Sequence, residues 1–194
     1  MRKRKKTGGG LFGWFMLLLF VAAIFFTYDQ MNRPAADEDT GIVQLANAKA
    51  PTSLNKTVEA KTNKLISRAA DIGIVLFITD GFRNSEQQEQ LYAQGRTAPG
   101  SVVTQARGGE SYHNYGLAVD FALKNKAGQA IWDMTYDGNG NGKADWMEVV
   151  DLAKDLGFDW GGDWPGFKDY PHLQMDFGLS ISDLQNGYRP EGSQ

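Results

Sequence analysis

The sequence of 194 residues contains no cysteine and only two histidines. Without thiols, the chain can form no disulfide bond and offers no thiolate metal ligand, no cysteine nucleophile and no N-terminal cysteine for lipid attachment. Any bound metal must therefore be held by histidine, aspartate or glutamate. The scarcity of histidine draws attention to the two positions where it does occur.

Negative charges outnumber positive charges once the N-terminus is passed. Residues 2–6 supply five positive charges before the first acidic residue, so the net charge of −3 for the whole chain becomes −8 for residues 29–194. A domain with this negative balance is a poor partner for a phosphate backbone, and we expect no nucleic acid partner.

One long apolar run opens the chain. Residues 11–28 carry no charge over 18 positions and follow the basic flank 1–10, a pattern that predicts a transmembrane signal anchor with its flank in the cytoplasm. The alternatives are a signal peptide cleaved after Val21-Ala22-Ala23, which would release a secreted protein, and a buried core helix. The anchor places the rest of the chain outside the cell membrane, on the cell-wall side.

The remaining sequence divides into a linker, a domain and a tail. Residues 29–52 are polar and rich in small residues, as in a tether; the globular domain is expected over 53–178 and a C-terminal tail over 179–194. Within the domain, periodicity predicts helices over 53–73, over 84–95 (capped by Asn84 or Ser85) and over 144–158, and strands over 74–80, 116–123 and 171–178. The fold class is α+β.

The two histidines stand at the starts of predicted strands. His113 lies seven residues before Asp120, an aspartate within the apolar strand "GLAVDFAL", and His172 opens the strand "PHLQMDFG". A buried carboxylate needs a partner, and a cation is a natural one. Two imidazoles and one carboxylate form the ligand set of a catalytic zinc site, although three packed polar residues would show the same spacing.

The motifs around these residues also resemble a known family. "SYHNYGLAVD" and "DYPH" fit the two signatures of the zinc D-alanyl-D-alanine carboxypeptidase and L-alanyl-D-glutamate endopeptidase family, and residues 60–178 look most similar to the cell-wall endopeptidases of bacilli and their phages. The resemblance implies a hedgehog/DD-peptidase-like fold with a small antiparallel sheet and flanking helices. It further implies that His113, Asp120 and His172 hold one catalytic Zn²⁺.

The same resemblance suggests catalytic and substrate-binding residues. Asp169 occupies the position of the family's catalytic acidic residue, where it would act as general base, with Asp163 as the second choice. Arg83 matches an arginine after the first strand and would bind a carboxylate or a developing oxyanion. Ser111 either orients substrate or caps the turn before His113.

Aromatic residues crowd the approach to Asp169. Four of them could line a binding cleft or pack into the core, and the sequence leaves both interpretations open: Trp160, Trp164, Phe167 and Tyr170.

A second metal is suggested by "DGNGNGKADWME", residues 137–148. It carries the calcium-loop pattern of oxygen ligands at Asp137, Asn139, Asn141, Asp145 and Glu148, with Gly142 at the sixth position. The preceding residues do not look like an entering helix. The alternative is a capping box in which Asp145 and Glu148 start the following helix without any metal.

These observations predict a zinc peptidase that cleaves the stem peptide of peptidoglycan, at the L-alanyl-D-glutamate bond, by metal-activated water. The alternatives are a D-alanyl-D-alanine carboxypeptidase and a non-catalytic zinc module that binds the cell wall. The intact set of Arg83, Asp169 and three metal ligands favours an enzyme.

The anchor can be tested by washing membranes that contain the protein with alkaline carbonate. An uncleaved helix over 11–28 holds the chain in the membrane through this wash, and the purified protein retains its N-terminal sequence. Release into the wash, or a mature chain that starts near Ile24, would show that the segment is not an anchor.

Overall fold

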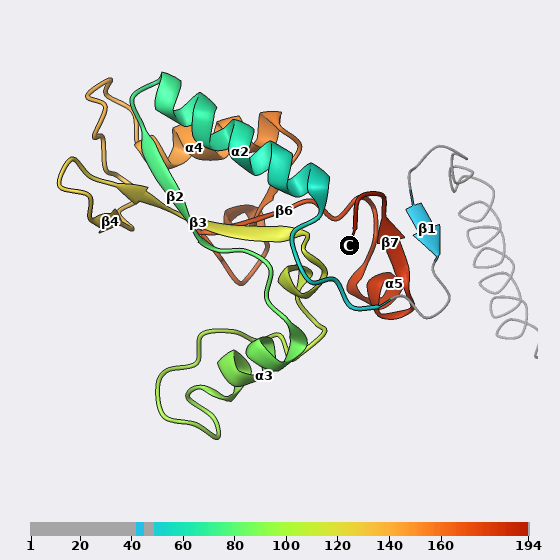
Figure 1. Ribbon diagram of the computed structural model, residues 1–194. Coiled ribbons are helices and arrows are strands. Elements are labelled where there is room, and N and C mark those ends of the chain that lie inside the picture. Colours follow the sequence, from blue (N-terminus) through green and yellow to red (C-terminus); the bar gives the residue numbers. More distant parts are fainter. Residues whose placement is uncertain (1–41, 45–48, 194) are drawn as a thin grey trace, which may run out of the picture. The chain divides into compact units, whose positions relative to one another are not determined.

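The computed structural model describes residues 42–44 and 49–193 (Figure 1). The fold is built on an antiparallel sheet in the order β2-β3-β6-β5, with β4 paired to the free part of β3. The strands are β2 (Val75–Asp80), β3 (Ala118–Lys124), β4 (Ala130–Ile131), β5 (Asp159–Trp160) and β6 (His172–Gln174). The α+β class with a small antiparallel sheet is confirmed.

Two helices cover one face of this sheet, as Figure 1 shows. In α2 (Lys56–Asp71) the side chains of Val58, Leu65 and Ala69 are buried, because their spacing places them on one side of the helix. Asn55 caps the helix start by accepting a hydrogen bond from the Thr57 amide at 2.8 Å. The neighbouring helix α4 (Asp145–Asp155) packs against α2.

The core lies between these helices and the sheet. Phe121 of β3 and Trp146 of α4 are almost completely buried, and their rings lie 4.6 Å apart. Every residue of β3 from Ala118 to Leu123 is buried except Asp120, which is partly exposed. A strand buried along nearly its whole length fixes the one carboxylate that it carries.

Strand register brings the polar residues of the site into one row. Asp120 of β3 lies opposite His172 of β6 on one side and opposite Asp80 of β2 on the other. The strand that follows His113 therefore lies directly beside the strand that begins at His172. The row lies where β2 leaves the sheet and β6 enters it.

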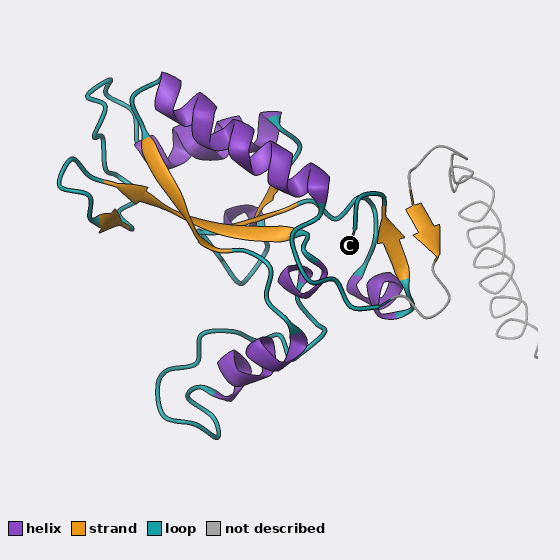
Figure 2. Cartoon of the chain, viewed as in Figure 1, coloured by secondary structure: helices purple, strands orange, loops and turns teal. Residues whose placement is uncertain are grey.

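The second predicted helix of the domain, over 84–95, forms as α3 (Ser85–Ala93), which Figure 2 shows set apart from the helical layer. Asn84, one of the two predicted caps, accepts a hydrogen bond from the Gln87 amide at 2.8 Å, and the Gln87 side chain accepts one from Asn84 in return. The loop that follows α3 leads back to the 3₁₀ helix η1 (Tyr112–Tyr115).

The predicted capping box at the start of α4 is wrong. The N-cap residue is Ala144, which has no side-chain acceptor, and Asp145 is the first residue inside the helix. Its carboxylate instead accepts a hydrogen bond from the amide of Gly138 at 3.0 Å, while Glu148 contacts the side chains of Asn139 and Asn141. Both carboxylates therefore bind groups of the preceding loop and do not cap the start of α4.

The segments flanking the domain contribute short elements. β1 (Ile42–Gln44) lies within the segment predicted as a linker and pairs with β7 (Tyr188–Pro190). The segment predicted as a tail contains β7 and α5 (Ile181–Gln185), whose Leu184 is fully buried. A second 3₁₀ helix, η2 (Gly161–Asp163), follows β5.

Within residues 42–44 and 49–193, no helix combines the length and the hydrophobicity needed to cross a membrane. The segment 11–28, for which an anchor is predicted, lies outside these residues, so the anchor stays a prediction.

Candidate metal centre

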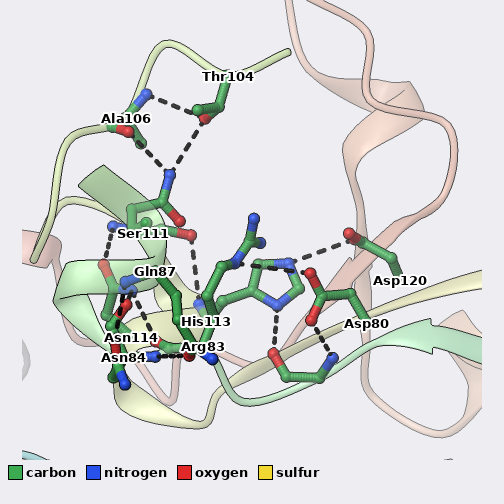
Figure 3. Close-up of polar contacts among 12 residues, drawn as sticks. Asp80, Arg83, Asn84, Gln87, Thr104, Ala106, Ser111, His113, Asn114 and Asp120 are labelled. Carbon is green, nitrogen blue, oxygen red and sulfur yellow. Dashed lines mark hydrogen bonds and ion pairs between the residues drawn. The ribbon is translucent and has the colours of Figure 1, made fainter. Parts of the chain in front are cut away.

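Three side chains from three different elements converge on one point. His113 comes from η1, Asp120 from β3 and His172 from the first position of β6. His113 Nε2 lies 3.2 Å from His172 Nδ1, and each of these nitrogens lies 3.3 Å from Asp120 Oδ1. Figure 3 shows the His113 ring turned toward Asp120. The structure thus brings together the three residues predicted as metal ligands.

In each imidazole, the outer nitrogen, which is the one that does not face Asp120, lies within hydrogen-bond distance of a carbonyl oxygen. His113 Nδ1 lies 2.7 Å from the backbone oxygen of Gly81, and His172 Nε2 lies 3.0 Å from the side-chain oxygen of Gln174. A carbonyl oxygen only accepts, so each outer nitrogen must carry the proton. In the neutral rings, the inner nitrogens, His113 Nε2 and His172 Nδ1, therefore carry no proton. Their lone pairs face each other.

This arrangement fits a zinc ion. Two lone pairs and a carboxylate oxygen repel one another at 3.2–3.3 Å, and a cation between them removes the repulsion. In a tetrahedral zinc site with bonds of about 2.0–2.1 Å, neighbouring donor atoms lie about 3.3–3.4 Å apart. The three observed separations match one face of such a tetrahedron. Outer carbonyl acceptors of this kind are also the usual support of zinc-bound imidazoles.

The electrostatics of Asp120 are consistent with a charged ligand. Burial acts to raise the pKa of this carboxyl, but the hydrogen bonds and positive charge that His113 and His172 supply in the metal-free chain, when their rings are protonated, outweigh it and hold the pKa well below its ordinary value. Asp120 is therefore ionised at neutral pH.

The turn around His113 holds the ring in place. Ser111 caps η1, its hydroxyl accepting a hydrogen bond from the His113 amide at 3.4 Å, so the structure shows the capping role of the two considered for this serine. Gly116 ends the turn in the left-handed region at φ +68°, and a side chain there would collide with the backbone oxygen of Ser53. The amide of Arg83 donates to the His113 carbonyl at 3.2 Å.

A pocket of about 460 Å³ opens over the three ligands. Its walls come from the loop after α3, from the segment between η2 and β6, and from α5. The lining residues that bear on the chemistry are Arg83, Ser111, Trp164, Phe167, Asp169 and Gln174. A pocket of this size admits a short peptide segment.

Of the four aromatic residues, two line the pocket, one is buried in the core and one belongs to neither. Trp164 lines the pocket with its ring centre 5.0 Å from that of His172, and Phe167 lines it as well. Trp160 is instead buried, and its indole N–H donates to the Tyr170 carbonyl at 2.7 Å. Tyr170 is exposed and is not part of the pocket wall.

Arg83 lies at the edge of this pocket, with only 13% of its side chain exposed. Its Nε lies 3.6 Å from Asp80 Oδ2, an ion pair that Figure 3 marks with a dashed line. Asn114 supports the same loop, because its amide nitrogen donates to the Arg83 carbonyl at 2.8 Å.

The two candidate bases lie in different places. Asp169 lines the pocket, and burial, followed by the negative charge of Asp120, raises the pKa of its carboxyl. A side chain at Gly161 would collide with the Asp169 backbone, so this glycine permits their close packing. Asp163 lies outside the pocket and is ion-paired to Lys154 at 2.6 Å.

Two residues that hold the imidazole rings in place, Gln174 and Gly81, were not predicted from the sequence. Gln174 follows His172 by two positions in β6, so the alternation of a strand places both on the same face, a signal that the sequence does contain. The Gly81 carbonyl left no such signal, because any residue type offers a backbone oxygen.

The fold and the centre define a metallohydrolase, in which two imidazoles and one carboxylate face a pocket. Comparison with known proteins makes this assignment specific. Residues 104–175 match the peptidase M15 family described as D-alanyl-D-alanine carboxypeptidase.

Two relatives extend the match. The peptidoglycan L-alanyl-D-glutamate endopeptidase CwlK of Bacillus subtilis (strain 168) is 61% identical over 125 residues, which cover 64% of this chain and 75% of that protein. The L-alanyl-D-glutamate peptidase of Listeria phage A118 is 33% identical over 124 residues, or 64% of this chain and 38% of that protein. The chain belongs to this family of zinc metallopeptidases.

Among solved structures, DacB from Streptococcus pneumoniae D39 gives a TM-score of 0.49 at 21% identity, covering 77% of this chain and 84% of that one.

Replacing Gln174 by leucine should lower zinc affinity by about 10- to 100-fold, the usual effect of losing an outer partner of a metal-bound histidine. Without the Gln174 oxygen, the His172 ring loses the contact that fixes its protonated nitrogen. Zinc affinity is measured by competition with a chromogenic chelator.

The matched control is Gln174→Glu, which keeps an acceptor oxygen and should hold zinc at least as tightly as the unchanged protein. Unchanged affinity in Gln174→Leu would mean that this contact does not support the metal.

Proposed function

We propose that the protein is a zinc-dependent peptidoglycan hydrolase that cleaves the stem peptide at the L-alanyl-D-glutamate bond. The observation that carries the proposal is the convergence of three donor atoms at one end of a peptide-sized pocket. The 61% identity to an endopeptidase of that specificity supports the choice of substrate.

His113, Asp120 and His172 would hold the zinc ion through the atoms that face one another. When bound, zinc acts as a Lewis acid that polarises a carbonyl group and lowers the pKa of water toward about 7. Gly81 and Gln174 keep both rings in the protonation state that this role needs.

Asp169 acts as the general base. It lines the same pocket as the metal ligands and occupies the position of the family's catalytic acidic residue, so its carboxylate is available to take a proton there. Asp169 accepts a proton from the attacking water while the new carbon–oxygen bond forms. It then donates that proton to the amine nitrogen as the carbon–nitrogen bond breaks.

Arg83 supplies the positive charge for substrate binding. Arg83 lines the pocket, and Nε is the atom that pairs with Asp80. A planar guanidinium pairs well with a carboxylate or with an oxyanion that develops during the reaction. Ser111 lines the same wall, so it can contact substrate as well as cap the turn.

The location follows from the substrate. A stem peptide lies outside the cell membrane, and the predicted anchor over 11–28 would hold the domain there, on the cell-wall side. Cleavage of the segment would instead give a secreted enzyme with the same activity.

The family description itself gives a second candidate reaction, removal of terminal D-alanine. Both reactions use the same metal and base, and they differ in which bond of the stem lies over the centre. A non-catalytic module that binds the cell wall would leave the stem intact.

Digestion of purified muropeptides, followed by mass spectrometry, distinguishes these outcomes. The zinc-loaded protein should separate L-alanine from the rest of the stem. In Asp169→Ala, zinc should remain bound while turnover falls by a factor of about 10² to 10⁴, the usual contribution of a positioned general base.

Asp163→Ala is the matched control, because it removes a carboxylate from the same segment but outside the pocket; its turnover should stay near normal. Release of D-alanine alone would establish the carboxypeptidase, and intact muropeptides the binding module. Zinc loss in Asp169→Ala would make this residue a ligand, and near-normal turnover would exclude it as the base.

A further inference from the structure

The loop before α4 gathers oxygen ligands at a place that the peptidase chemistry does not use. None of its residues, 137–148, lines the pocket over the zinc ligands. The loop runs directly into α4, which begins at Asp145, and it is preceded by the short strand β4 rather than by a helix.

The backbone of this loop is wound tightly around its first residue. Asp137 accepts hydrogen bonds from the amides of Gly140 and Asn141 with one oxygen and from the amide of Gly142 with the other, at 2.7–3.1 Å. Gly142 adopts φ +84°, a conformation that favours glycine at the sixth position of a calcium loop. This winding brings the first and last residues of the loop, Asp137 and Glu148, toward each other.

The last ligand position closes the loop. Glu148 lies one turn into α4, and its two carboxylate oxygens receive the Asn141 amide at 2.9 and 3.0 Å. Asn139 reaches the same carboxylate at 3.2 Å. The side chains at the first, third, fifth and twelfth positions are therefore gathered in one cluster.

Asp145 provides an independent indication of a ligand. The residue is only 3% exposed, and its Oδ1 is buried without a hydrogen-bond partner, while Oδ2 receives the Gly138 amide and so turns the group toward the loop. A buried carboxylate oxygen without a partner is costly, and a cation would satisfy it.

The donor chemistry selects the cation. The cluster contains three carboxylates and two amides, with no nitrogen or sulfur ligand of the kind that zinc prefers. Calcium takes six to eight oxygen ligands in flexible geometry, whereas magnesium demands a tighter octahedral arrangement.

We propose that residues 137–148 bind one calcium ion. The ligands are the side chains of Asp137, Asn139, Asn141 and Glu148, the backbone oxygen of Lys143, and Asp145 directly or through water. The ion acts as a structural clamp. Asn139 also donates to the carbonyl of Ile72, at the end of α2, at 3.2 Å, so the loop joins the end of one covering helix to the start of the other.

Calcium should stabilise the folded full chain. Loaded with zinc and kept in a mild detergent because of its apolar run, the protein should show a thermal midpoint about 5 to 10 °C higher at a calcium concentration 100 times the dissociation constant. Magnesium at the same concentration should give a clearly smaller shift. Scanning calorimetry measures both.

Glu148→Gln should abolish the calcium shift, and Asp151→Asn, an exposed carboxylate on the same helix, should retain it. Asp145→Asn provides a second test if Glu148→Gln fails to fold. Isothermal titration with calcium chloride should show one site in the unchanged protein and none in Asp145→Asn. The proposal is overturned if up to about 10 mM calcium gives no shift, if magnesium does as well, or if both ligand variants retain the shift.

Discussion

The structure depends on a carboxylate that stands in an otherwise buried strand and faces two imidazole nitrogens. Asp120 would destabilise β3 if it were left alone there. Because the outer nitrogens of His113 and His172 are held by carbonyl oxygens, neither inner nitrogen can donate a proton to Asp120 while the rings are neutral. Only additional positive charge removes the repulsion among these three atoms. It can come from protons on the rings or from a metal ion. The separations of the three donor atoms match the metal.

The apolar framework determines how accurately this charge is placed. The sheet register sets Asp120 opposite His172, and the packing of Phe121 on Trp146 fixes β3 against the helical layer. His113 reaches the centre from a separate turn, held by its own cap and by the loop that carries Arg83. A site built on rigid elements keeps its ligands within the narrow tolerance that zinc requires. The pocket walls, in contrast, come mainly from loops.

The sequence predicted the metal ligands because the chain has only two histidines, both near the starts of apolar runs, and because Asp120 lies within such a run, where a carboxylate needs a partner. Periodicity likewise predicted α2, α3, α4, β2, β3 and β6, but the short elements β1, β4, β5, β7 and α5 are too brief to show a period. Gly81 could not be predicted, because its contribution is a backbone oxygen. The aromatic residues could not be divided into pocket and core, because Trp160 and Trp164 differ only in how the chain turns at η2. The capping box failed because a local pattern at Asp145 was outcompeted by contacts with the preceding loop.

The central claim, that two imidazoles and one carboxylate hold zinc, is tested most directly by X-ray absorption at the zinc edge of the full chain. The account predicts a four-coordinate shell at about 2.0–2.1 Å, with the outer-shell scattering of two imidazole rings and the remaining ligands oxygen. A shell of six oxygen atoms, or scattering from one ring or none, would contradict it.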